Sequence, residues 1–218
     1  MVRIGIELNG IIRDVNKQIL KYYVKDINKE FDDEGVDMNV FNLADHLDFG
    51  SKKKKHDFMY IDYPYELYGC AKECKKDLLV RFNDGRDELN NAHGNEVEVF
   101  FFSPMENALT IQSTYFFLSK TGCRVREMRF PKDARDVWKI ADIVVTNNKE
   151  IIESRPSDKF CILVENSENK SLECDVHITV KDFDAITKNF EMIKKLIEEK
   201  PIVKNNWFNR MLRRVKNG

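Results

Sequence analysis

Long apolar segments are missing from this sequence. No run approaches the roughly 20 consecutive apolar residues that a membrane-spanning helix needs. A signal-peptide pattern is missing too, because the chain passes at once into a strand-like run. We therefore expect no membrane span, no secretion, and a location in the cytoplasm, or in the virion if the protein is a phage component.

Cysteine and histidine are scarce and scattered. The five cysteines contain no CxxC spacing and an odd number cannot all pair, which favours reduced thiols; they are Cys70, Cys74, Cys123, Cys161 and Cys174. Cys70 and Cys74 stand one helical turn apart, but no second Cys or His pair follows at ligand spacing. We interpret them as buried small hydrophobes and expect neither a metal site nor a cofactor there.

An excess of one charge is absent as well. The 36 Lys and Arg residues nearly cancel the 37 Asp and Glu residues, so the net charge argues neither for nor against nucleic acid. The 42% hydrophobic content is typical of a folded protein. A chain of 218 residues accommodates one core, or one core with a small insertion.

Strand and helix patterns alternate from residue 96 onwards. The predicted strands cover 96–102, 123–130, 142–146, 160–164 and 177–180, and the predicted helices cover 108–120, 133–140, 149–154 and 184–200. Short, apolar strands separated by helices predict an α/β fold with a Rossmann-like, doubly wound parallel sheet. The strand-like run at 2–8 has the same character and is assigned to the same sheet.

The eighty residues between that first strand and residue 96 are interpreted as an insertion. We expect in it a helix over 15–31, a solvated loop at Lys52–Lys55, a helix over 66–76 and an extended or helical piece over 78–89. The resulting domain prediction is a core of 1–14 and 96–200, a mainly helical insertion of 15–95, and a C-terminal tail of 201–218.

The end of the first strand carries the most informative motif. An apolar run leads into Glu7-Leu8-Asn9-Gly10, followed by two aliphatic residues and Arg13-Asp14. This resembles the opening motif of the haloacid dehalogenase (HAD) superfamily, Asp-x-Asp-Gly. The resemblance implies that Glu7 stands at the position of the nucleophile and Asn9 at that of the general acid/base. It also implies that the insertion is the family's cap.

Three further positions follow the family order. Phe100-Phe101-Phe102-Ser103 resembles the strand whose terminal hydroxyl holds a phosphate oxygen. Lys132 and Lys139 are both placed to be the phosphate-neutralising lysine, and spacing does not choose between them. Thr146 and Asn147 stand where the family has the paired acids that hold Mg²⁺.

The departures from the family pattern predict lost chemistry. Mg²⁺ prefers anionic oxygens, and Thr146 and Asn147 offer neutral ones. Asn9 has no titratable proton, so it cannot act as a general acid or base. Glu7 reaches one methylene further than Asp, which misplaces an in-line nucleophile. The resemblance therefore implies a catalytically inactive member.

Structural roles also explain these residues, and we favour them over catalysis for Glu7 and Ser103. Glu7 is readable as a strand-end carboxylate that caps a neighbouring helix. Asn9-Gly10 is readable as a plain turn, since both residues tolerate positive φ. Ser103-Pro104 is readable as an N-cap for the following helix. A residual anion site at Ser103 stays open, because helix N-termini bind phosphate without metal.

Two segments are candidates for partner binding. The aromatic stretch 58–68 includes Tyr63 and Tyr65, and tyrosine is favoured in interface hot spots, although packing inside the insertion is an equal reading. The tail lacks acids and has the spacing of a basic amphipathic helix, with candidate contact residues Trp207, Phe208, Arg210, Met211, Arg213 and Arg214. Docking on a protein is favoured there, with nucleic acid as the weaker alternative.

The sequence leads to three functional hypotheses. The first is a non-catalytic HAD-like structural or interaction protein, for example a phage virion or assembly component. The second is a nucleotidase-like phosphohydrolase that uses Glu7, with Mg²⁺ in an altered site. The third is a sensor that binds a phosphate or nucleotide near Ser103 without turnover.

Overall fold

The computed structural model describes residues 1–93, 97–104, 106–172 and 178–184. Its centre is a six-stranded sheet in the order β5-β4-β1-β6-β7-β8, with every neighbouring pair parallel. The strands are β1 (Val2–Glu7), β4 (Val97–Phe102), β5 (Met128–Arg129), β6 (Ile143–Thr146), β7 (Phe160–Val164) and β8 (Ile178–Val180). This confirms the predicted α/β class and the Rossmann-like parallel sheet.

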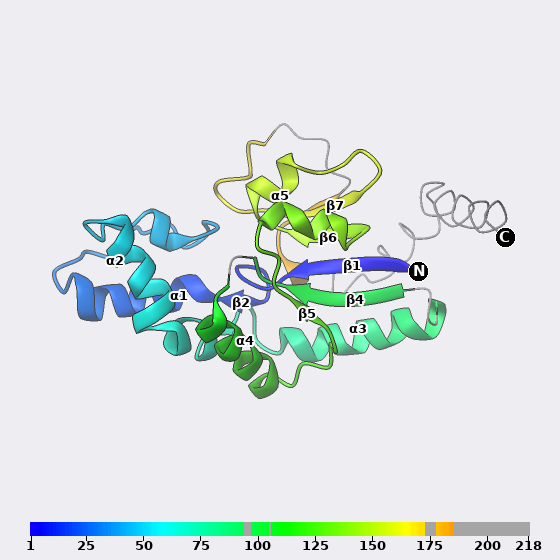
Figure 1. The fold of residues 1–218 in the computed structure, drawn as a ribbon, viewed down its shortest axis with the longest axis horizontal. Coiled ribbons are helices and arrows are strands. Elements are labelled where there is room, and N and C mark those ends of the chain that lie inside the picture. Colours follow the sequence, from blue (N-terminus) through cyan, green and yellow to red (C-terminus); the bar gives the residue numbers. More distant parts are fainter. Residues whose placement is uncertain (94–96, 105, 173–177, 185–218) are drawn as a thin grey trace.

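Helices cover both faces of the sheet (Figure 1). On one face, α3 (Leu78–His93) and α4 (Ala108–Lys120) share a buried cluster with Ile4 and Ile6 of β1. On the other face, a 3₁₀ helix (Ala134–Lys139) and α5 (Lys149–Glu153) pack against Phe100 and Val144. Burial on two sides explains why the central strands are apolar at nearly every position.

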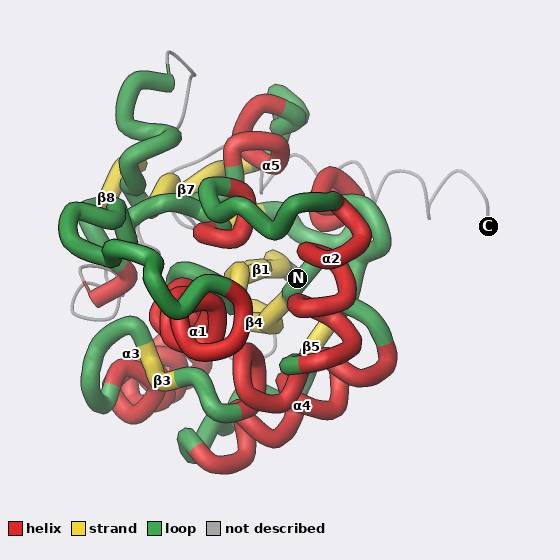
Figure 2. The backbone as a smooth tube through the Cα atoms, turned by 90° about the vertical axis from the view of Figure 1, so that its left-hand side faces the viewer, coloured by secondary structure: helices red, strands yellow, loops and turns green. Residues whose placement is uncertain are grey.

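Most of the insertion forms a second, smaller cluster. It contains α1 (Val15–Tyr22), a π-helical turn (Tyr23–Ile27), a 3₁₀ turn (Leu43–Asp45), α2 (Lys52–Asp57) and two further π-helical turns (Phe58–Asp62 and Tyr65–Gly69). Tyr23, Phe58 and Leu67 are buried at its centre. Figures 1 and 2 show α1 and α2 beyond the carboxyl end of β1, the end at which the chain enters the insertion. We call residues 15–71 the inserted segment.

Three predictions within the insertion need correction. The helix expected over 15–31 is shorter: α1 ends at Tyr22, and a π-helical turn continues it to Ile27. The predicted loop at Lys52–Lys55 is the start of α2, because the Ser51 side chain caps that helix by accepting from the Lys54 amide. The helix expected over 66–76 is present only at its start, in the π-helical turn Tyr65–Gly69; further on the chain forms β3 (Lys72–Glu73), which pairs antiparallel with β2 (Arg13–Asp14).

That strand pairing also changes the reading of the cysteines. The Cys74 amide donates to the Ile12 carbonyl, so Cys70 and Cys74 do not lie on one helix. Both thiols are free and partly buried. Burial raises the pKa of the Cys74 thiol to about 12, so this side chain stays protonated at neutral pH.

The core region follows the prediction closely, with two corrections. The strand expected over 123–130 is reduced to Met128–Arg129. The N-cap of α4 is Asn107, in a capping box with Thr110, and not Ser103. By contrast, α4, β6 and β7 lie where the apolar patterns place them. α3 lies within 15–95, yet its Leu78, Leu79 and Phe82 belong to the core of the sheet.

Two predicted features lie outside the described residues. They are most of the helix at 184–200 and the whole tail at 201–218, with the tail's six candidate contact residues. Among the described helices, none combines the length and the apolar character that crossing a membrane requires.

Candidate functional site

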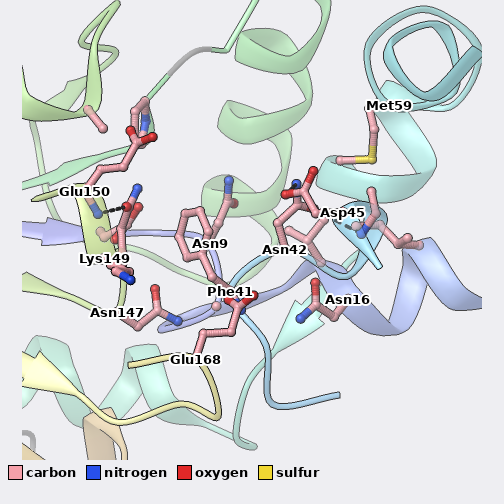
Figure 3. Close-up of a pocket in the computed structure, with 18 of the residues that line it drawn as sticks. Asn9, Asn16, Phe41, Asn42, Asp45, Met59, Asn147, Lys149, Glu150 and Glu168 are labelled. Atoms are coloured by element: carbon pink, nitrogen blue, oxygen red, sulfur yellow. Dashed lines mark hydrogen bonds between the residues drawn. The ribbon is translucent and has the colours of Figure 1, made fainter. Parts of the chain in front are cut away.

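A cavity of about 670 Å³ lies between the carboxyl ends of the strands and the inserted segment. Figure 3 shows Asn147 and Lys149 on the sheet side of this cavity and Asn16 and Met59 on the side of the inserted segment. Its lining includes the buried acid Glu7 and buried amides at the strand ends, and aromatic and cationic side chains from the insertion. Parallel α/β sheets commonly bind ligands at this edge, where the strand order reverses next to the first strand.

Glu7 ends β1 and is fully buried. The Thr146 hydroxyl donates to Glu7 Oε2, and the backbone N–H of Asn148 donates to Thr146 Oγ1 at 3.0 Å. Burial raises the pKa of Glu7 to about 7, although the nearby donor groups of Thr146, Asn147 and Asn148 act in the opposite direction and lower it. Asn148 is the N-cap of α5, so Glu7 lies beside the start of a neighbouring helix. This position agrees with the interpretation of Glu7 as a strand-end carboxylate.

The side chains of Asn9 and Ser103 are hydrogen-bonded to each other. Asn9 Nδ2 donates to Ser103 Oγ at 3.1 Å, and Asn9 Oδ1 accepts from Arg13 Nε at 2.8 Å. Ser103 Oγ in turn donates to Glu106 Oε1 at 2.5 Å. The two positions that resemble catalytic ones therefore both form hydrogen bonds within the protein.

Arg13 and Glu106 lie at the centre of this network. Arg13 is fully buried; it donates to Glu106 Oε1 at 2.6 Å and to Thr114 Oγ1 at 2.5 Å. Its guanidinium also lies 5.0 Å from the centre of the Tyr68 ring. The network connects the end of β1, α4 and the inserted segment. The sequence shows Arg13 directly after two aliphatic residues, but that signal does not reveal its partner 93 positions away.

The two lysines expected near a phosphate lie elsewhere. Neither Lys132 nor Lys139 lines the cavity, and Lys139 pairs with Asp136 at 2.6 Å. Lys149, at the start of α5, does line it, together with Lys52 and Lys55 of α2. Lys55 is already paired with Asp45 at 2.6 Å. The cavity's cations therefore come from residues for which the motif comparison assigned no role.

The donor groups at Thr146 and Asn147 fit a magnesium ion poorly. Thr146 is engaged with Glu7, and the backbone carbonyl of Asn147 accepts from Asn166 and Asn169, both at 3.1 Å. Within the described residues, no three His, Cys, Asp or Glu side chains gather closely enough to hold a metal ion. One carboxylate among neutral oxygens does not fit the charge that Mg²⁺ prefers in its ligands.

The inserted segment is tied to the sheet through the turn after β7. Glu168 Oε2 accepts from the Phe41 amide at 2.8 Å, and Glu168 Oε1 lies 2.8 Å from His46 Nε2. The Ser167 amide donates to the Asn39 carbonyl at 2.8 Å. We call these three contacts the Glu168 clasp. It holds one wall of the cavity in place, and no motif in the sequence indicates it.

The two tyrosines proposed for partner binding have different environments. Tyr63 packs in the inserted segment, with its ring 5.3 Å from Tyr22 and 5.1 Å from Phe58. Tyr65 is 48% exposed and lies 5.2 Å from Phe116 of α4, which is 43% exposed. Tyr63 thus has the packing role, whereas Tyr65 belongs to an exposed aromatic pair.

Comparisons with known proteins add no relatives. No protein-family model matches the chain, and no curated protein is similar enough to match it. The likeness to the HAD superfamily therefore rests on the four motif positions and on the parallel sheet with its insertion after the first strand.

Proposed function

We propose that this protein is a non-catalytic HAD-like protein that acts by binding. One observation carries the proposal: Asn9 and Ser103 are bonded to the buried pair Arg13 and Glu106. In an active member these two positions face the substrate phosphate. Here their hydrogen-bonding groups serve the fold.

The electrostatics of the network support the same conclusion. The Ser103 hydroxyl donates to a carboxylate, so the Glu106 oxygen lies where a phosphate oxygen would need that donor. Two anionic oxygens at such short range repel each other, and burial strengthens the repulsion. Asn9 cannot transfer a proton, and the donor set at Glu7, Thr146 and Asn147 does not fit Mg²⁺.

An interaction role is supported by the exposed pair of Tyr65 and Phe116. Exposed aromatic side chains are favoured in protein interfaces because they bury a large area at small entropic cost. The pair links the inserted segment to α4, so a protein partner would contact both units at once. A role as an assembly component belongs to this proposal.

A second candidate function is ligand binding without turnover. The cavity of about 670 Å³ has the size of small-molecule sites and mixes polar groups with an apolar wall.

Hydrolysis of a generic phosphate ester tests the absence of catalysis. The wild type and Glu7→Gln are assayed side by side with Mg²⁺, Mn²⁺ and Co²⁺. We expect equal background rates, because neither protein has a working acid/base or metal site. Turnover by the wild type that Glu7→Gln abolishes would overturn the proposal and establish the nucleotidase-like alternative.

A further inference from the structure

Two buried acceptor atoms on the cavity wall have no hydrogen-bond partner among the described residues. They are Glu7 Oε1 and Asn147 Oδ1. Glu7 is fully buried and Asn147 is 4% exposed. Native proteins pair nearly all such atoms, because an unpartnered buried acceptor loses its bond to water and gains nothing in return.

The two residues belong to one small region. Glu7 ends β1 and Asn147 directly follows β6, which pairs with β1 in parallel. Both line the same cavity. The hydroxyl of Thr146 satisfies the second oxygen of Glu7, so one carboxylate oxygen remains for a partner from the cavity.

Charge narrows the identity of that partner. Within the described residues the Glu7 carboxylate is bonded to the neutral Thr146 hydroxyl and to no cation, although a buried carboxylate is normally paired. Two of the three lysines that line the cavity pair with other acids: Lys149 lies 3.6 Å from Glu153, and Lys55 lies 2.6 Å from Asp45. A ligand that supplies both a positive charge and several N–H donors would satisfy Glu7 and Asn147 together.

The cavity wall formed by the inserted segment can pack against the non-polar part of such a ligand. Phe41 and Met59, both labelled in Figure 3, line the cavity together with Tyr60. Apolar and aromatic side chains of this kind pack against hydrocarbon or ring systems. Aromatic faces also attract ammonium groups.

We propose that the cavity binds a small molecule through a primary ammonium group, which donates to Glu7 Oε1 and Asn147 Oδ1. This inference rests on the second candidate function, binding without turnover. According to this inference, the ends of the strands bind a cation, whereas a phosphate site binds an anion.

Three probes with one body and different head groups test the inference: benzylamine, benzyl alcohol and benzoate. Binding is followed by NMR titration of the full-length protein at pH 8, where Glu7 is ionised. We expect benzylamine to bind about tenfold or more tightly than benzyl alcohol, and benzoate to bind no better than the alcohol. Glu7→Gln is expected to remove the advantage of the amine, whereas Glu150→Gln, which removes an acid from the cavity's rim, is expected to retain it.

A second readout needs no variant. The advantage of benzylamine over benzyl alcohol is expected to shrink below pH 7 in the wild type, because protonation removes the charge of Glu7. Equal binding of all three probes, tighter binding of benzoate, or an advantage that persists in Glu7→Gln would overturn the inference. Protection by Mg²⁺ or inorganic phosphate in a thermal shift, with none by benzylamine, would also overturn it. None of these outcomes bears on the hydrolysis assay, so the two proposals fail separately.

Discussion

Arg13 Nη2 lies 2.6 Å from Glu106 Oε1, and the two side chains are 0% and 2% exposed. The pair is accompanied by bonds to Asn9, Ser103 and Thr114, so its charges and donors are largely satisfied inside the protein. A buried ion pair of this kind contributes little net stability compared with an apolar pair. Removing one partner, however, leaves the other charge buried and unpaired, which is strongly destabilising. Its main effect here is to hold the two catalytic-like positions in a closed network.

Removal of one member of this pair should destabilise the fold strongly. We expect Arg13→Met to lower the free energy of unfolding by about 3–5 kcal/mol, because Glu106 is left buried without its cation. The double variant Arg13→Met/Glu106→Leu should recover most of that loss. Urea unfolding measures both. As a control, Lys17→Ala should change stability by less than about 1 kcal/mol, because Lys17, which pairs with Asp14, is itself 68% exposed. A single variant as stable as the wild type would show that the pair is not buried in solution.

Glu7 should make stability depend on pH. Its pKa is about 7 in the folded protein and 4.5 as an ordinary value, so the folded state binds more protons between these limits. Stability should therefore fall as pH rises from about 4.5 to about 7, by about 3 kcal/mol in total, and this contribution should be constant above that range.

Comparison of the wild type with Glu7→Gln isolates this effect. The variant should lose the decline in unfolding free energy between pH 5 and pH 8, while Glu150→Gln, at the exposed rim, should keep it. Parallel pH profiles for the wild type and Glu7→Gln would contradict the raised pKa.

Gly10 should tolerate no side chain, for two separate reasons. Its φ is +73°, and an added Cβ would lie 2.7 Å from Asn147 Nδ2. Gly35 is a matched control, since its φ is +80° and an added Cβ meets nothing within 4 Å. We expect Gly35→Ala to cost about 1 kcal/mol through backbone strain and Gly10→Ala to cost about 2–3 kcal/mol, measured by thermal or urea unfolding. Equal losses would mean that Asn147 moves aside freely.

The Glu168 clasp should slow local opening of the inserted segment around Phe41. Glu168→Ala removes the acceptor of the Phe41 amide and the partner of His46. We expect hydrogen exchange at Phe41 to become about tenfold faster, because local opening no longer breaks a hydrogen bond to a carboxylate. Lys170→Ala, in the same turn, should leave exchange unchanged. Equal exchange in the wild type and Glu168→Ala would show that other contacts hold the inserted segment.

The sequence by itself determined the elements whose signals are local. The helix Ala108–Lys120 and the strand Phe160–Val164 lie where they are predicted, because a Gly after the helix and the spacing of apolar residues decide such elements over short distances. The parallel sheet followed from the alternation of these elements. The same local signals placed Glu7, Ser103 and Thr146 at strand ends, and hence at one edge of the sheet.

Only the tertiary structure decided what those strand-end residues do. Arg13 reaches Glu106 across 93 positions, and Glu168 reaches His46 across 122. Neither partner can be read from a local pattern, because a polar side chain has many possible partners until the sheet brings distant loops together. The strand β3 was missed for the same reason: its residues pair with Arg13–Asp14 and not with their sequence neighbours. Burial likewise arises only in the folded chain, so the raised pKa of Glu7 and the unpartnered oxygens beside it are properties of the fold.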